Sequence, residues 1–155
     1  MNKIKNIAII ASPDNKTDLI EWSYFNKEAL AKHQILALGS TANILEGTLN
    51  KKVNVLESGK PGEYSALRNL IEENKVDAVI IFDDAGKIMH NRSLYSIMET
   101  AIRNNIIIAT NRTTADFVIT SKLIDNEYKI STDEKKITNK NTFAVSKTYP
   151  LAKAS

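Results

Sequence analysis

Five polar segments of this 155-residue chain carry the kinds of side chain that bind small anions. Each directly follows a short apolar run. At the start of a helix, backbone N–H groups point outward and the helix dipole favours negative charge, so such segments suit a phosphate or a carboxylate. One segment alone is ordinary capping or turn chemistry, and it is the set that predicts an anion site. The segments are Asp14-Asn15-Lys16, Gly39-Ser40-Thr41, Ser58-Gly59-Lys60, Asp83-Asp84 and Asn111-Arg112-Thr113.

The elements that position these segments alternate between strand and helix patterns. Short apolar runs predict buried strands at 4–11, 35–38, 53–56, 78–82 and 106–109. Helical patterns predict helices at 16–32, 42–49, 64–74, 89–103 and 111–119. Because parallel neighbours need crossover connections, this alternation predicts an α/β fold: a three-layer α/β/α architecture around a five-stranded, mostly parallel sheet.

In such a sheet, ligands bind outside the carboxyl ends of the strands, where the polar segments collect. His90 follows Asp83 by seven residues and therefore lies at this ligand-binding edge. A single surface histidine is usually inert, but this position makes His90 a candidate contact to the ligand. The other histidine, His33, ends a predicted helix, where we expect it to partner the helix dipole.

Composition narrows the possible functions. With 43% apolar and 25% charged residues, the chain has the make-up of one soluble domain with a real core. The net charge of +3 comes without a dense Lys/Arg run, which argues against a nucleic-acid partner. Zero cysteines and two histidines argue against a metal site, and we expect no cofactor. No apolar stretch approaches the length of a membrane span or a signal segment, so we expect a cytoplasmic protein without a membrane partner.

The last part of the chain differs in composition from the rest. Residues 1–124 form the predicted α/β domain, and 125–155 form a polar extension rich in Lys, Thr, Asn, Asp and Ser. Within it, 128–137 is a candidate hairpin or edge strand, and the extension is a candidate oligomerisation arm. Candidates for an apolar contact surface between subunits are Trp22, Tyr24, Tyr95 and Met98.

Several sequence blocks resemble the methylglyoxal synthase family. They are Ile-Ala-Ile-Ile-Ala before Asp-Asn-Lys, then Leu-Gly-Ser-Thr-Ala, then Ser-Gly, and above all Ile-Ala-Thr-Asn-Arg-Thr-Thr-Ala-Asp-Phe-Val-Ile at 108–119. The likeness covers about 4–122 in order. The last block is specific to this family, whereas the Gly-Ser-Thr-Ala element is shared with the regulatory domain of carbamoyl phosphate synthetase and its superfamily. The resemblance implies flavodoxin-like layering and a homo-oligomer, a hexamer in family members.

The resemblance also implies a chemistry. Methylglyoxal synthases remove a carbon-bound proton from dihydroxyacetone phosphate to give an enediolate, and then expel phosphate. Such a reaction needs a phosphate cradle, a carboxylate base and a group that polarises the substrate oxygens. The family's strand-four aspartate falls on Asp83, with Asp84 as the one-residue alternative, and its histidine falls on His90. The cradle falls on Lys16, Ser40, Thr41, Ser58 and Gly59.

The residues at the positions of the family's catalytic groups depart from the family pattern. The family's Gly-Gly-Asp, which supplies the base, reads Pro61-Gly62-Glu63-Tyr64 here, and ungapped counting puts Tyr64 at the aspartate. Glu63 serves as the base if the loop is one residue shorter. The family's His-Asp in the first loop becomes Ser12-Pro13, with Asp14 as the adjacent stand-in.

Three further family groups lack a match. Leu38 replaces a threonine, Ser93 ends the His-x-x-Asp motif, and Arg112 is the last arginine of the chain, so the arginine of the family's C-terminal helix has no counterpart. We expect a methylglyoxal synthase with catalytic groups Glu63, Asp83, His90 and Asp14. The alternative is a catalytically impaired protein of the same fold that binds a phosphorylated metabolite or a nucleotide.

Overall fold

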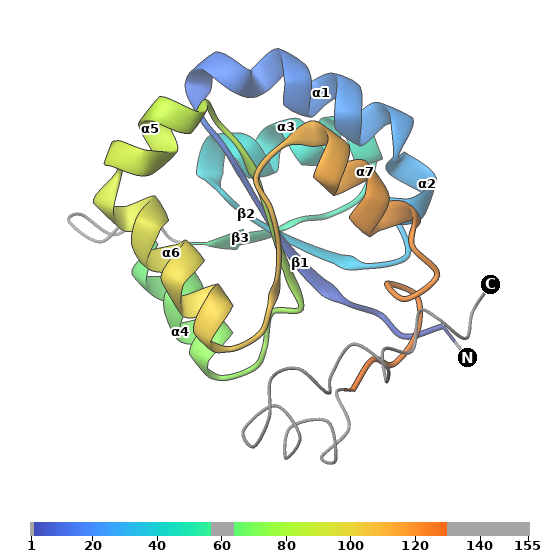
Figure 1. Cartoon of the computed structure of the whole chain (residues 1–155). Helices are drawn as coiled ribbons and strands as arrows, with labels where there is room; N and C mark the ends of the chain where they lie inside the picture. The colour runs from blue at the N-terminus through green and yellow to red at the C-terminus, as the bar shows by residue number, and fades with distance from the viewer. Residues whose placement is uncertain (1, 57–63, 130–155) are drawn as a thin grey trace.

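The computed structural model describes residues 2–56 and 64–129. Strands and helices alternate along the chain (Figure 1). The strands are β1 (Asn6–Ala11), β2 (Gln34–Leu38), β3 (Asn54–Leu56), β4 (Ala78–Phe82) and β5 (Ile107–Ala109). A 3-10 turn, η1 (Pro13–Asn15), precedes the first helix. The helices are α1 (Lys16–Phe25), α2 (Lys27–Leu30), α3 (Gly39–Leu49), α4 (Ser65–Glu72), α5 (Ala85–His90), α6 (Arg92–Arg103) and α7 (Arg112–Thr120).

The five strands form one sheet in the order β3-β2-β1-β4-β5, and every neighbouring pair is parallel. The central strand β1 is paired on both sides, with Ile7 opposite Ile35 of β2 and Ala78 of β4. The predicted α/β/α fold is therefore confirmed. Because the chain leaves β1 toward β2 and returns beyond β1 to form β4, the strand order reverses between β1 and β4, which is the usual place for a ligand crevice in such a sheet.

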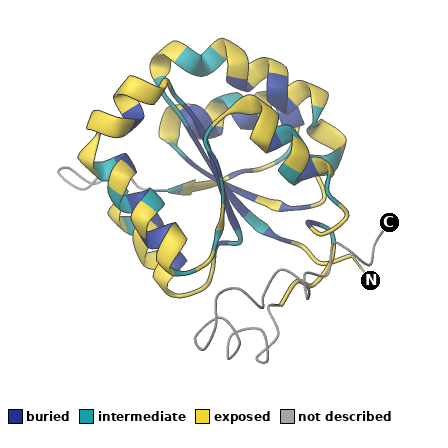
Figure 2. Cartoon of the chain, in the orientation of Figure 1, coloured by how far each residue is buried: buried dark blue, intermediate teal, exposed yellow. Residues whose placement is uncertain are grey.

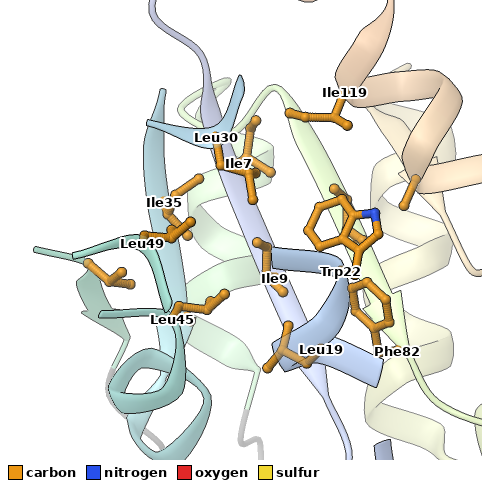
Figure 3. Close-up of a cluster of buried hydrophobic side chains, with 14 of the residues drawn as sticks. Ile7, Ile9, Leu19, Trp22, Leu30, Ile35, Leu45, Leu49, Phe82 and Ile119 are labelled. Atoms are coloured by element: carbon orange, nitrogen blue, oxygen red, sulfur yellow. The ribbon is translucent and has the colours of Figure 1, made fainter. Parts of the chain in front are cut away.

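Helices cover both faces of the sheet, and the central strands β1 and β4 are almost wholly buried between them (Figures 1 and 2). Along β1, Ile7 and Ile9 face α1, α2, α3 and α7, whereas Ala8 and Ile10 face α4, α5 and α6. Alternation of this kind follows from the period of two in a strand. On the α1 face, the ring of Trp22 packs on that of Phe82, with centroids 5.2 Å apart (Figure 3).

Two predicted helices are each divided in two. The helix predicted at 16–32 breaks at Asn26, whose side-chain amide donates hydrogen bonds to the Trp22 carbonyl (3.0 Å) and to Asp116 Oδ1 (3.3 Å). The helix predicted at 89–103 breaks at Asn91, whose Oδ1 accepts the N–H groups of Ser93 and Leu94 and so begins α6. In both cases an asparagine side chain offers the backbone an alternative to the continuous helix.

The segment after α7 folds back against the start of β1. The Lys3 N–H donates to the Asp125 carbonyl at 2.7 Å, and Ile124 is buried. The candidate hairpin at 128–137 lies outside the described residues from 130 onward, and the boundary at 124 stays a prediction. Within the described part of the chain, no helix is both long and apolar enough to cross a membrane.

From the sequence, Trp22 is either a core or a contact residue, and the structure shows that it is core, because it has no exposed surface; Tyr24 and Tyr95 are exposed. The prediction for His33 is wrong. His33 is buried: its Nδ1 accepts the Lys5 N–H at 3.1 Å, and its Nε2 lies 3.4 Å from Asp125 Oδ1. Burial lowers the pKa of His33, against the opposing effect of Asp125, and thus disfavours the cation that a helix-dipole partner requires.

Candidate functional site

Three of the predicted ligand-binding segments, those that follow β1, β2 and β4, lie at the carboxyl edge of the sheet. Because β1 lies between β2 and β4, the segments that follow these three strands are neighbours there. The Ser12 N–H donates to the Phe82 carbonyl at 3.0 Å and joins the ends of β1 and β4. Helices α1 and α3 pack against each other on one face, so the start of α1 lies beside the start of α3.

The start of α3 is open. The residue before the helix is Leu38, and among the described residues no side chain caps the first N–H groups. Helix α3 begins at Gly39, three residues earlier than predicted, so the Gly-Ser-Thr segment is its first turn rather than its cap. Gly39 and Ser40 are exposed, Thr41 is buried, and a Cβ added at Gly39 would meet no atom of the described residues within 4 Å. An exposed first turn with uncapped amides offers donors of the kind that an anion requires.

Lys16 supplies the charge on this side. It is the first residue of α1 and is half-buried. Two other described cations of this edge are paired within the protein: Arg112 with Glu21 at 3.2 Å and Lys87 with Asp14. Among the described residues, no carboxylate pairs with Lys16.

Carboxylates dominate the neighbouring segments, where β1 and β4 end. Asp83 Oδ1 accepts the Asp84 N–H at 2.8 Å, and Asp84 Oδ1 caps α5 by accepting the Lys87 N–H at 2.9 Å. The Lys87 ammonium group donates to Asp14 Oδ2 and lies 3.8 Å from Asp84 Oδ2. This side of the site therefore holds three carboxylates around one lysine.

The ion pair with Lys87 makes Asp14 less suited to act as a catalytic base. The hydrogen bond and the charge of Lys87 lower the pKa of Asp14, and Asp14 in turn raises the pKa of Lys87. A carboxylate with a lowered pKa is a weaker base, so Asp14 fits a counter-ion better than a proton acceptor. The sequence interpretation missed Lys87, because α5 was expected to begin only at 89; the spacing of three from Asp84 is the local signal.

Some of the remaining predicted residues lie in the described part of the chain, and others do not. His90 is the last residue of α5 and is exposed. Ser58, Gly59 and Glu63 lie outside the described residues. Tyr64, the residue that ungapped counting puts at the family's base, is half-buried and packs against the apolar cluster beneath α4 and α6.

A cavity lies elsewhere in the molecule. It has a volume of about 320 Å³ and lies between α7, the start of β5 and the segment after α7. Because Lys5 and Ile107 precede or begin strands, this cavity is toward the opposite edge of the sheet from the site. Its lining is mainly apolar, with Phe117, Val118 and Leu123, and it does not suit a phosphate.

Comparison with known proteins gives a consistent result. A methylglyoxal synthase from Proteus mirabilis is 35% identical over 127 residues, which cover 81% of this chain and 84% of the relative. One from Photorhabdus laumondii is 34% identical over 131 residues, covering 84% and 86%. The crystal structure of methylglyoxal synthase from Elizabethkingia anophelis matches with a TM-score of 0.74 at 27% identity, over 91% of this chain and 93% of that one. No family model matches the chain.

Proposed function

The chain belongs to the methylglyoxal synthase family, and we propose that it is a carbon–oxygen lyase that converts dihydroxyacetone phosphate to methylglyoxal and inorganic phosphate. The observation that carries the proposal is the open start of α3 beside Lys16, next to a cluster of carboxylates. This arrangement offers one place for a phosphate and an adjacent place for proton transfer. By the same proposal, the protein acts in the cytoplasm as a homo-hexamer and needs no cofactor.

In this proposal the phosphate is held by the α3 side of the site. The N–H groups of the first turn and the hydroxyls of Ser40 and Thr41 donate hydrogen bonds to the phosphate oxygens, and Lys16 balances their charge. Ser58 and Gly59 complete the cradle. Binding there orients the three-carbon chain across the end of β1 toward β4, because these strands are neighbours.

The reaction then takes place between β1 and β4. Glu63 removes a proton from the hydroxymethyl carbon, on the other side of the carbonyl from the phosphate ester, and the electron pair moves to the carbonyl oxygen to form the enediolate. Asp83 supports the proton transfer, and His90 contacts the substrate oxygens. Collapse of the enediolate breaks the carbon–oxygen bond to phosphate, and the enol that remains becomes methylglyoxal by taking up a proton.

A second candidate function is binding without turnover. Two observations favour it: Tyr64 packs toward α4 and α6, and Ser93, which ends the His-x-x-Asp motif here, lies in the first turn of α6. Neither position supplies a carboxylate to the site. In this case the phosphate half would hold a phosphorylated metabolite or a nucleotide, and the protein would act as a sensor.

Turnover of dihydroxyacetone phosphate separates the two functions. We expect the unaltered chain to release methylglyoxal and phosphate in equal amounts, and Glu63→Gln to lower kcat by at least roughly 100-fold, since general-base catalysis contributes about that much. Thr120→Ala, at the opposite end of α7, is the control and should retain full turnover. No turnover by a folded chain that binds phosphate esters would favour the sensor.

A further inference from the structure

One ion pair crosses the place where the strand order reverses. Asp14 lies in η1 after β1, and Lys87 lies in α5 after β4. The helices that follow these two strands cover opposite faces of the sheet. The Lys87–Asp14 pair therefore joins the two sides of the crevice, 73 residues apart in sequence.

This pair is held weakly enough to exchange partners. The side chain of Lys87 is 48% exposed and that of Asp14 is 73% exposed. Exposed ion pairs contribute little to stability, because water solvates the separated charges almost as well. A ligand anion that enters the crevice can thus replace Asp14 at the Lys87 ammonium group.

The position of Lys87 defines the part of the ligand that it meets. A phosphate at the start of α3 lies at the end of β2, and β1 separates β2 from β4. The other end of a short phosphate ester therefore extends toward Asp14, Asp83 and Lys87. Lys87 is the cation on this carboxylate side, whereas Lys16 belongs to the phosphate side.

We propose that Lys87 contacts the non-phosphate end of the bound ester and selects ligands that carry or develop an oxygen anion there, and that Asp14 is the counter-ion which the ligand displaces. The inference rests on the phosphate site proposed at α3. For dihydroxyacetone phosphate, the anion is the oxygen of the enediolate, whose charge a neighbouring ammonium group stabilises.

Two esters that differ only at the non-phosphate end test this role. 2-Phosphoglycolate ends in a carboxylate, and 2-hydroxyethyl phosphate ends in an alcohol on the same two-carbon chain. Titration calorimetry on the full chain should show that Lys87→Met weakens 2-phosphoglycolate by roughly 10- to 100-fold, the loss of one charge-assisted contact. It should change 2-hydroxyethyl phosphate by less than about threefold, and Lys87→Arg should restore most of the preference.

Asp14→Asn gives a change of opposite sign. Without its counter-ion, Lys87 is free in the unliganded protein, so 2-phosphoglycolate should bind several-fold tighter while 2-hydroxyethyl phosphate is unaffected. If the ion pair were only structural, Asp14→Asn would leave the affinity for both esters unchanged. Both side chains are exposed, so these variants should fold as the unaltered chain does.

The control is Ser40→Ala with Thr41→Ala, which should weaken both esters alike. If that double variant weakens both esters but Lys87→Met changes the two equally or not at all, the role of Lys87 is wrong and the phosphate site stands. If neither ester binds the unaltered chain, or the double variant binds both normally, the phosphate site itself is wrong and the inference fails with it.

Discussion

Helices α3 and α5 both follow strands that end at the same edge of the sheet, but their first turns are built differently. Helix α3 follows Leu38, and among the described residues no side chain caps its first amides. Helix α5 follows Asp84, whose carboxylate already accepts the Lys87 N–H. An uncapped helix start costs stability and gives a ligand free donors, whereas a capped start is satisfied within the protein. This difference supports our proposal that α3 binds the phosphate and that the region around α5 supplies side-chain chemistry.

The largest effect on ligand binding is expected when the start of α3 receives a carboxylate, as the start of α5 already has. Ser40→Asp places a carboxylate among the first amides, where it repels a phosphate and interacts well with the helix dipole. Calorimetry should show the affinity for 2-hydroxyethyl phosphate lowered by about 100-fold or more. The midpoint of thermal unfolding should stay equal or rise.

Thr113→Asp is the matched control, since Thr113 holds the same position in the first turn of α7. That helix is capped by Asn111, whose Oδ1 accepts the Thr114 N–H at 2.8 Å. The control should bind the ester normally. Normal binding by Ser40→Asp would place the phosphate somewhere other than α3.

Two glycines of one helix give a finer comparison. Gly39 and Gly47 both lie in α3, neither has a left-handed backbone, and a Cβ at either would meet no atom of residues 2–56 and 64–129 within 4 Å. Gly47→Ala should stabilise the helix by about 1 kcal/mol without altering ligand affinity. Gly39→Ala adds a methyl group over the open amides and should weaken 2-hydroxyethyl phosphate by roughly tenfold. Equal affinities of the two variants would contradict an approach of the phosphate to Gly39.

Removal of the α5 cap should affect stability alone. Asp84→Ala deprives the Lys87 N–H of its acceptor, so denaturant unfolding should show a loss of about 1 kcal/mol. The affinity for 2-hydroxyethyl phosphate should be unchanged, because that ester is held at α3. A marked loss of affinity would mean that the α5 side also holds the phosphate.

The smallest expected change is in the pH dependence of stability. It arises from His33, at the end of the molecule away from the site. Burial lowers the pKa of His33 below its ordinary value of 6.5, so the unfolded chain binds the proton more readily than the folded one. The stability that neutral His33 contributes is therefore fully present above pH 6.5. As the pH drops below 6.5, the free energy of unfolding falls. Denaturant titrations between pH 7 and 5 should show this decline in the unaltered chain and in His90→Gln, and a weaker decline in His33→Gln.

The sequence contained enough to predict the sheet but less to predict where its helices begin. Strand β4 reads Ala-Val-Ile-Ile-Phe and is buried on both faces, which is the pattern of a central parallel strand. The start of α3 was misplaced because Gly-Ser-Thr is typical of a cap. In the structure, Leu38 ends β2 and passes directly into the helix, and this depends on how β2 packs.

The features that the sequence did not predict depend on contacts between distant segments. The ion pair of Lys87 with Asp14 forms only because β1 and β4 are neighbours. The burial of His33 requires Asp125 and its neighbours to fold back against the start of β1. Lys16, Ser40 and Thr41 were identified from residue type and family resemblance, and their roles stay predictions.

The most direct test of the central claim is a two-dimensional 1H–15N NMR titration of the full chain with 2-hydroxyethyl phosphate. This ester lacks a second anion, so it reports on the phosphate position alone. We expect the largest shifts at the amides of Gly39, Ser40 and Thr41, with small changes across α5. Unmoved amides at the start of α3, with shifts concentrated in α5 or beside the cavity at α7, would contradict the assignment of phosphate binding to α3.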